Sequence, residues 1–352
     1  KLGLDRCGAT QLRRDGQRTA GLVNDSHAHR CRGIRSSRAA SRRASGSTSC
    51  RGARPRGSRR RAAEEIILGG SAGSAAEEMS YLGLDLGATN VKGALVDDEG
   101  RVLAHALEPL GDGAATLAPA AVAEVLARVA QSCVRDWAAV RAVGVGAPGA
   151  IEGDAITGCA NLFRGARFPV PLAALVAARL HGKRIVLVND ADAAALAERW
   201  VGAARGFERA AVLTLGTGVG CGLFLGGDAP LRDVEAGHAS VGGPDGRPCP
   251  CGARGCLEAY AAAPAIVRAY GDDSVTCRDV VARAASDDRA ARAVDGAARY
   301  LAVGCLDLCR TLDVGAVVLT GGVARAGPPF LDRVRRHARE MDWTCLPGRA
   351  DR

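Results

Sequence analysis

The sequence predicts an α/β fold, because short apolar strands alternate with helical segments along most of its 352 residues. Two segments, 82–96 and 211–225, have the apolar pattern of β-hairpins around glycine-containing turns. Continuous apolar strands are expected at 142–146, 185–188 and 316–320, with helical stretches between them. With 47% apolar residues, the chain can bury sizeable cores.

In the first hairpin, Leu82, Leu84 and Leu86 alternate with other residues before the turn, and an apolar run then continues to Val96. The expected elements that follow are a helix near 115–132, a strand at 142–146, a strand at 185–188 ending in Asn189-Asp190, a helix at about 192–201, the second hairpin, helices around 260–270 and 288–310, and a strand at 316–320 ending in Gly321-Gly322. Strands and helices are thus mixed throughout the foldable chain.

Residues 1–62 differ from the rest, because they are rich in Arg, Ser, Gly and Ala and have no helical or strand period, which predicts disorder. Residues 1–78 carry 17 Lys and Arg against 7 Asp and Glu. The whole chain has 47 basic and 38 acidic residues, so residues 79–352 have 30 basic and 31 acidic residues and are nearly neutral. The net charge of +9 therefore comes from this segment. Since Met79 directly precedes the first strand, we expect that residues 1–78 are not part of the native protein. A nucleic-acid-binding tail is the functional alternative.

The composition favours a cytoplasmic protein. No uninterrupted apolar stretch of about 18 residues occurs, and the Arg-rich N-terminus lacks the pattern of a secretory signal, so no membrane partner is expected. The 13 cysteines are an odd number scattered over a long chain. Free thiols, some of them binding a metal ion, fit this better than a disulfide framework.

Two turns, 85–90 and 215–220, place glycine and threonine at the tip of a hairpin. Glycine lets backbone N–H groups approach an anion, and a threonine hydroxyl adds a donor. Asp85, beside the first turn, is placed to hold magnesium directly or through water. Neither turn matches the Walker pattern or the dinucleotide-binding fingerprint, and each alone fits an ordinary hairpin. Together with Gly321-Gly322 they predict phosphate binding.

A metal site is predicted where one imidazole and three thiols fall within nineteen residues: His238, Cys249, Cys251 and Cys256. Such a ligand set suits tetrahedral zinc, and four protein ligands would make the ion structural. The alternative is three buried or free cysteines near an unrelated histidine.

The segments Glu-Ala-Gly-His at 235–238 and Cys-x-Cys-Gly-x-x-Gly-Cys-Leu-Glu at 249–258 together strongly resemble the signature of the ROK (repressor, open reading frame, kinase) family. The resemblance covers about 81–340 and includes Ala-Pro-Gly at 147–149, Asn161-Leu162 and Val-Val-Leu-Thr-Gly-Gly-Val at 317–323. It implies a two-lobed actin-like ATPase fold of the hexokinase, Hsp70 and ribonuclease H type. The small lobe would span 79–188 and the large lobe 189–352, with 1–78 outside the fold.

The resemblance also implies that the cleft between the lobes binds a hexose and ATP with Mg²⁺. The expected ATP-binding residues are Asp85, Gly87, Thr89, Asn90, Lys92, Gly216, Thr217, Gly218, Gly321 and Gly322. The expected sugar-binding residues are Asn161, Asn189, Glu235, His238 and Glu258, with His238 binding zinc through its other nitrogen.

Asp190 is the candidate general base, because a carboxylate at the end of an apolar strand faces the cleft of an open α/β sheet. A helix N-cap region is the alternative for Asn189-Asp190. The family's catalytic aspartate lies in a matching Asn-Asp pair, which favours catalysis.

Within the family, the motifs resemble those of bacterial ATP-dependent glucokinases, so glucose is the expected acceptor. N-acetylmannosamine, N-acetylglucosamine and fructose kinases share nearly the same residues. Two alternatives are not enzymes: a sugar-responsive transcriptional regulator and a non-catalytic sugar-binding protein. Residues 1–78 show no paired helices of the DNA-binding kind, so no nucleic acid partner is expected. The resemblance implies a homodimer or homotetramer.

Two features depart from the family pattern. Val234 stands where the family usually has glycine. The chain ends at Arg352, where the family usually continues into a closing helix rich in glycine and alanine. The large lobe is therefore expected to be truncated, with a core face exposed.

Overall fold

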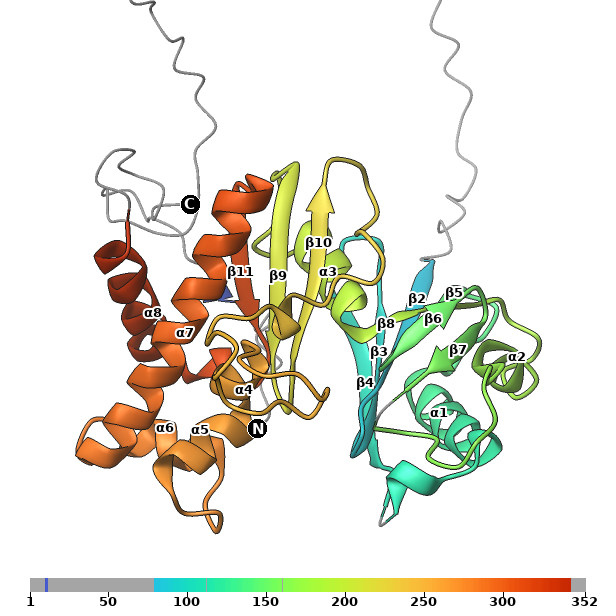
Figure 1. Cartoon of the computed structure of the whole chain (residues 1–352). Coiled ribbons are helices and arrows are strands. Elements are labelled where there is room, and N and C mark those ends of the chain that lie inside the picture. Colours follow the sequence, from blue (N-terminus) through green and yellow to red (C-terminus); the bar gives the residue numbers. More distant parts are fainter. Residues whose placement is uncertain (1–9, 12–78, 112, 160, 343–352) are drawn as a thin grey trace, which may run out of the picture. The chain divides into compact units, whose positions relative to one another are not determined.

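The computed structural model describes residues 10–11, 79–111, 113–159 and 161–342, all of which belong to one compact unit. Strands and helices alternate along the chain, so the predicted α/β class is confirmed (Figure 1). The expectations of disorder and of a non-native N-terminal segment fall outside the described residues, apart from Thr10–Gln11. These two residues form β1 and pair antiparallel with Leu319 and Val318.

The first sheet has five strands in the order β4-β3-β2-β5-β8. β2 pairs antiparallel with β3 and parallel with β5, and β5 pairs parallel with β8. The strands are β2 (Ser80–Leu86), β3 (Asn90–Val96), β4 (Val102–Pro109), β5 (Val140–Ala147) and β8 (Ile185–Asn189). The sequence did not predict β4, because this edge strand exposes Val102, Leu103 and Leu107 and buries little.

One face of the first sheet is covered by α1 (Pro119–Cys133) and α2 (Leu172–Ala177), which share a core with Leu82, Leu84 and Leu86 (Figure 1). Successive side chains of a strand point to opposite faces, so the residues between these leucines face away from the core. That second face carries an apolar groove. The groove is lined by Tyr81, Gly83, Ala142, Val186 and Trp200, among others.

The second sheet has the order β1-β11-β9-β10. β9 (Arg209–Leu215) pairs antiparallel with β10 (Val219–Leu225) and parallel with β11 (Ala316–Thr320). The helix α3 (Asp190–Trp200) packs against β10, where a Cβ on Gly222 would be only 2.3 Å from Ala195 Cβ. Because α3 also contacts β5 and β8, it lies between the two sheets.

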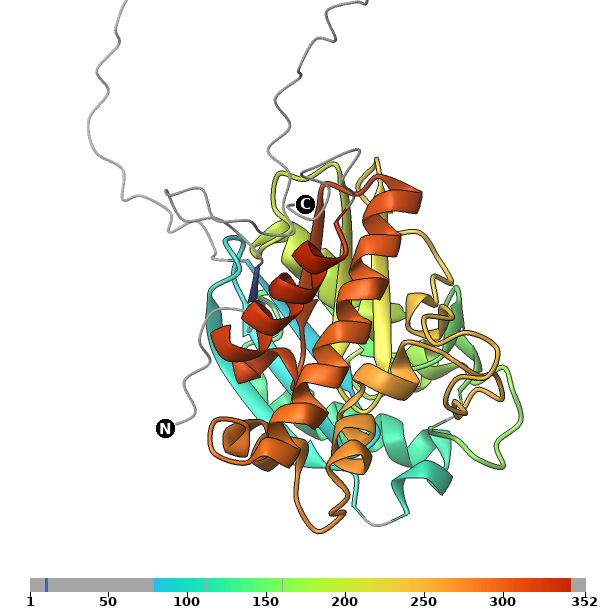
Figure 2. The ribbon, with the colours of Figure 1, turned by 60° about the vertical axis from the view of Figure 1, so that its left-hand side comes forward.

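The second sheet shares a core with a layer of helices, in which α7 (Asp288–Leu312) and α8 (Pro328–Glu340) lie side by side (Figure 2). The same layer holds α4 (Glu258–Ala261), α5 (Ala263–Tyr270) and α6 (Cys277–Arg283). Among the described residues, no helix combines the length and the apolar character needed to cross a membrane.

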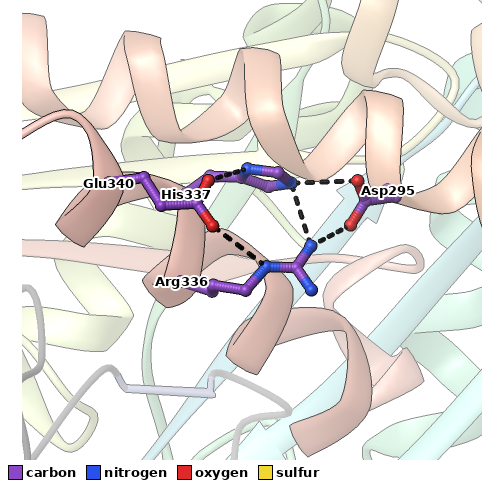
Figure 3. A network of polar contacts seen from close by, with 4 residues as sticks. All are labelled: Asp295, Arg336, His337 and Glu340. Atoms are coloured by element: carbon purple, nitrogen blue, oxygen red, sulfur yellow. Dashed lines mark hydrogen bonds and ion pairs between the residues drawn. The ribbon is translucent and has the colours of Figure 1, made fainter.

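A polar network joins α7 to α8 (Figure 3). The buried ring of His337 lies between two carboxylates, with Nδ1 3.0 Å from Glu340 Oε2 and Nε2 3.1 Å from Asp295 Oδ2. Arg336 pairs with both carboxylates. Since every charge in the network has a partner of opposite sign, the network stabilises helix packing without leaving an unpaired buried group.

Candidate active site

The turn between β2 and β3 is held by one hydrogen bond within the turn and one from the residue that follows the neighbouring strand β4. Gly87 N–H donates to Asn90 O at 3.0 Å, and Leu110 N–H donates to Thr89 O at 2.8 Å. Lys92 Nζ lies 2.7 Å from Asp85 Oδ2, and both side chains are more than half exposed, at 58% and 51%. The turn is therefore accessible to a ligand, with one acidic and one basic side chain beside it.

The turn between β9 and β10, residues 216–218, is held from outside as well. Gly216 N–H donates to Gly218 O at 3.0 Å within the turn. The Val219 N–H donates to Glu258 Oε2 at 3.0 Å, and Ala263 N–H donates to Gly216 O at 2.8 Å. Both outside contacts come from the segment that follows the candidate metal cluster.

Gly321 brings the end of β11 against the end of β9. It has φ +93°, and a Cβ there would lie 2.5 Å from Leu215 O. Val323 N–H also donates to Leu215 O at 3.1 Å. The predicted glycine pair Gly321-Gly322 is thereby placed next to the start of the turn at 216–218.

Asn189 caps α3, as the N-cap interpretation of this pair requires. Its Oδ1 accepts from the N–H groups of Ala191 at 2.8 Å and Asp192 at 3.3 Å. Its Nδ2 donates to Gly149 O at 3.1 Å. The side chain thus fixes the helix start that carries Asp190, and one hydrogen of its Nδ2 remains for another acceptor.

Asp190 is the first residue of α3, and its Oδ1 accepts from the Ala191 N–H at 2.9 Å. The residue is exposed, but nearby protein partly desolvates its carboxyl and raises the pKa of that group. The negative charge of Asp85 raises that pKa further. The structure brings together these two carboxylates, which were predicted from separate lobes. Asp85 pairs with Gly146 across the sheet, and a Cβ on Gly146 would lie 3.7 Å from Asp190 Cα.

The four predicted metal ligands converge. The ligand atoms of His238, Cys249, Cys251 and Cys256 all lie within 4.8 Å of one another. Cys251 Sγ is 3.7 Å from Cys256 Sγ, and Cys249 Sγ is 3.6 Å from His238 Nδ1. A tetrahedral ion with metal–sulfur bonds of about 2.3 Å places its ligand atoms about 3.5–3.8 Å apart, so the donor set fits such an ion. His238 offers Nδ1 to the cluster, which leaves Nε2 for another partner.

A cavity of about 130 Å³ lies beside the predicted sugar residues Asn189 and Glu235. Asp192, which the sequence reasoning missed, also lines it. Burial and the charges of Asp233 and Asp190 raise the pKa of Asp192 to about 6. Acidic residues are common in the first turn of a helix, where they interact favourably with the helix dipole. Nothing in the sequence therefore marks Asp192 as a residue of the cavity.

The sequence profile of the ROK family matches residues 81–343. The chain belongs to the ROK family. A glucokinase from Halalkalibacterium halodurans is 33% identical over 299 residues, which cover 77% of this chain and 88% of that protein. A glucokinase from Thermotoga maritima is 33% identical over 282 residues, covering 71% of this chain and 84% of the relative.

Solved ROK structures agree with these sequence relatives. A ROK glucokinase from Streptomyces griseus, in complex with glucose and AMPPNP, has 28% identity and a TM-score of 0.65, covering 77% of this chain and 96% of its own. A ROK hexokinase from Thermus thermophilus has 34% identity and a TM-score of 0.59, and the match covers 74% of this chain and 88% of the hexokinase. The predicted actin-like ATPase fold is thereby confirmed.

Within this ROK chain, the structure groups most of the predicted residues. Glu258 lies against the turn at 216–218, and Asp85 lies near Asp190. Asn161 is exposed and lines neither the 130 Å³ cavity nor the apolar groove on the first sheet. Within the described part of the chain, it makes no hydrogen bond to the other predicted residues. Its proposed sugar contact therefore depends on the resemblance alone.

Proposed function

We propose that this protein is an ATP-dependent hexose kinase that converts glucose to glucose 6-phosphate. The observation that carries the proposal is that Asp85, beside the first glycine turn, pairs with Gly146, whose Cβ position lies 3.7 Å from Asp190 Cα at the start of α3. This arrangement gives one carboxylate for the metal-bound phosphates and one for the attacking hydroxyl. The identity to two glucokinases supports glucose as the acceptor.

In the proposed reaction, the sugar hydroxyl oxygen forms a bond to the γ-phosphorus of ATP. The bond between that phosphorus and the β,γ-bridging oxygen breaks, and ADP leaves. Asp190 accepts the hydroxyl proton, and Ala191 N–H holds its other oxygen in place. Mg²⁺ bound with ATP would neutralise phosphate charge, with Asp85 as its protein ligand directly or through water.

The phosphates would lie against the two glycine turns, where backbone N–H groups and the hydroxyls of Thr89 and Thr217 are the available donors. The adenosine would approach Gly321 and Gly322, and Asn90 and Lys92 would complete the nucleotide site. The hexose would contact the residues predicted for it, Asn161, Asn189, Glu235, His238 and Glu258.

We propose zinc as the ion of the Cys and His cluster. Four protein ligands close the coordination shell, so the ion would be structural and would not polarise the substrate. Bound through Nδ1, His238 would keep Nε2 for a sugar hydroxyl.

N-acetylmannosamine is the second candidate acceptor, because an N-acetylmannosamine kinase from Vibrio vulnificus is 30% identical over 256 residues, covering 70% of this chain and 84% of that protein. A ROK transcriptional regulator shares the fold at 21% identity and a TM-score of 0.63. A regulator would need a DNA-binding element in residues 1–78, and these lie almost wholly outside the described residues. The intact Asp85 and Asp190 favour the kinase.

A coupled ADP-release assay with MgATP tests the proposal, using glucose, mannose, fructose, N-acetylglucosamine and N-acetylmannosamine. We expect turnover with glucose, and a loss of about 10²–10⁴-fold in kcat in Asp190→Asn. Asp98→Asn, an exposed aspartate in the turn after β3, is the matched control and should retain turnover. Folded, metal-loaded protein that turns over none of these sugars would rule out the kinase.

A cytoplasmic location is part of the proposal, because a kinase needs ATP and because none of the nine cysteines among the described residues lies in a disulfide. The resemblance to the family further suggests a homodimer or homotetramer. Sedimentation equilibrium of the full chain would measure that state.

A further inference from the structure

Val219, which directly follows the turn at 216–218, is held by both segments that carry the ligands of the metal cluster. Its N–H donates to Glu258 Oε2 at 3.0 Å, and Glu258 lies just beyond the last cysteine. Its carbonyl oxygen lies so close to Gly237 that a Cβ at that glycine would be 1.8 Å away. Gly237 directly precedes the cluster ligand His238. The turn and the cluster are therefore joined through one residue.

Both oxygens of Glu258 lie along this connection. Oε1 is 3.8 Å from Cys249 Sγ. Oε2 lies close to the turn, because a Cβ added to Gly218 would be only 2.5 Å from it. Glu258 also begins α4, and Ala263, the first residue of the next helix, donates its N–H to Gly216 O at 2.8 Å. The carboxylate thus cannot move far without releasing a hydrogen bond of the turn.

We propose that Glu258 is a positioning residue that couples the metal cluster to the phosphate-binding turn, so that metal binding and nucleotide binding strengthen each other. This rests on the proposed function, because it assumes that the turn at 216–218 contacts nucleotide phosphates. It adds a second role for Glu258, beside the sugar contact implied by the family.

The physical reason is that an ion bound by one histidine and three cysteines fixes the backbone of both segments at once. Fixing these segments holds the Glu258 carboxylate on the Val219 N–H and holds Gly237 against the Val219 carbonyl. The turn then keeps one conformation, and the nucleotide need not order it on binding. Coupling between two sites is reciprocal, so bound nucleotide must favour the bound ion by the same factor.

The test uses the full chain loaded with Zn²⁺, with no sugar present. Calorimetry gives the Kd of MgAMPPNP before and after the ion is removed with a chelator, and a chromophoric chelator gives the rate of Zn²⁺ release with and without saturating MgAMPPNP. We expect nucleotide affinity to fall roughly tenfold on metal removal and metal release to slow with nucleotide, within the usual range of coupling between sites.

In Glu258→Ala, we expect weak nucleotide binding whether or not the ion is bound, and metal release that no longer depends on nucleotide. Glu235→Ala is the matched control, because Glu235 is also a predicted sugar residue but makes no hydrogen bond to the turn. This variant should keep the coupling. If Glu258→Ala fails to fold, the two measurements on the unmodified chain still decide whether the sites are coupled. Gly218→Ala, whose Cβ would lie 2.5 Å from Glu258 Oε2, then tests the role of Glu258 and should weaken the coupling.

A nucleotide Kd that changes less than twofold on metal removal, with release unaffected by nucleotide, would overturn the inference. Equal coupling in Glu258→Ala and in the unmodified chain would do the same. Absence of sugar turnover with the coupling intact would reject only the proposed kinase activity. Absence of any MgAMPPNP binding would reject both.

Discussion

The two glycine turns have similar sequences and very different support. The turn after β2 contacts little outside its own sheet, and its charged pair, Asp85 and Lys92, is more than half exposed. The turn after β9 is held by hydrogen bonds from Glu258 and Ala263, and Gly321 packs against the strand that leads into it. One turn therefore depends on local pairing and the other on contacts from distant segments.

Under the proposed function, this difference would give the two turns different roles toward one nucleotide. Segments with few buried contacts open and adjust at low free-energy cost, whereas segments tied to several elements keep one conformation. The second turn is thus suited to present a fixed set of donors. The first turn, with exposed side chains, is suited to adapt when a charged ligand arrives.

The largest expected effect comes from Gly321→Ala, which breaks the support of the second turn. The position has φ +93°, and a Cβ would lie 2.5 Å from the backbone oxygen of Leu215, so the backbone itself must shift. We expect a loss of about 3 kcal/mol in the free energy of unfolding. Gly322→Ala is the matched control, because its Cβ would meet nothing closer than 4.0 Å. Urea unfolding of both variants measures the difference.

Gly218→Ala tests the contact with Glu258 directly. Its Cβ would lie 2.5 Å from Glu258 Oε2, which must leave the Val219 N–H. Losing that hydrogen bond should cost about 1–2 kcal/mol of stability and raise the KM for ATP.

Gly87→Ala makes the same change in the first turn, where the Cβ would lie 3.1 Å from Asn90 O and needs only a small shift. We expect about 0.5 kcal/mol or less there. Equal losses of stability in Gly87→Ala and Gly218→Ala would contradict the difference in support between the turns.

Features encoded by neighbouring residues could be predicted from the sequence. The two hairpins, the strand ending in Asn189-Asp190 and the four converging side chains of the candidate metal cluster each lie within a short segment, where period, turn residues and residue spacing are visible. The pairing of β4 was missed, because an exposed edge strand lacks a clear apolar period.

Contacts between distant segments could not be predicted. Val219 and Glu258 are 39 residues apart, and nothing in either residue type marks their hydrogen bond. Asp192 was missed because its raised pKa depends on burial and on Asp233, which the fold alone brings near. Such features need the positions of side chains in space.

An effect smaller than that of Gly321→Ala is expected at Asp192, in the helix that packs against β10. Its pKa is raised from 3.8 to about 6 in the folded protein. Between about pH 4 and pH 6 the folded state keeps a proton that the unfolded state has released, so stability falls as the pH rises through this window. Asp192→Asn removes that cost.

Above about pH 6, we expect Asp192→Asn to raise the free energy of unfolding by about 1 kcal/mol, after allowing for solvent screening of the partly buried carboxylate. Below about pH 4 we expect no gain. Asp288→Asn, an exposed acid in the first turn of α7, is the control and should give no such pH-dependent gain. Urea titrations at pH 4, 5, 6 and 7 check both variants. A gain of equal size at pH 4 would exclude titration of Asp192 as its cause.

The smallest change in stability is expected for Lys92→Met, in the first turn. The pair with Asp85 is more than half exposed, so its loss should cost about 0.5 kcal/mol or less. Lys92 nevertheless offsets the charge of Asp85, which already raises the pKa of Asp190. Without Lys92 that pKa should rise further, and the acidic limb of the pH profile of kcat/KM should move to higher pH. An unchanged limb would show that the first turn and Asp190 act independently, and that the exposed turn contributes to nucleotide binding alone.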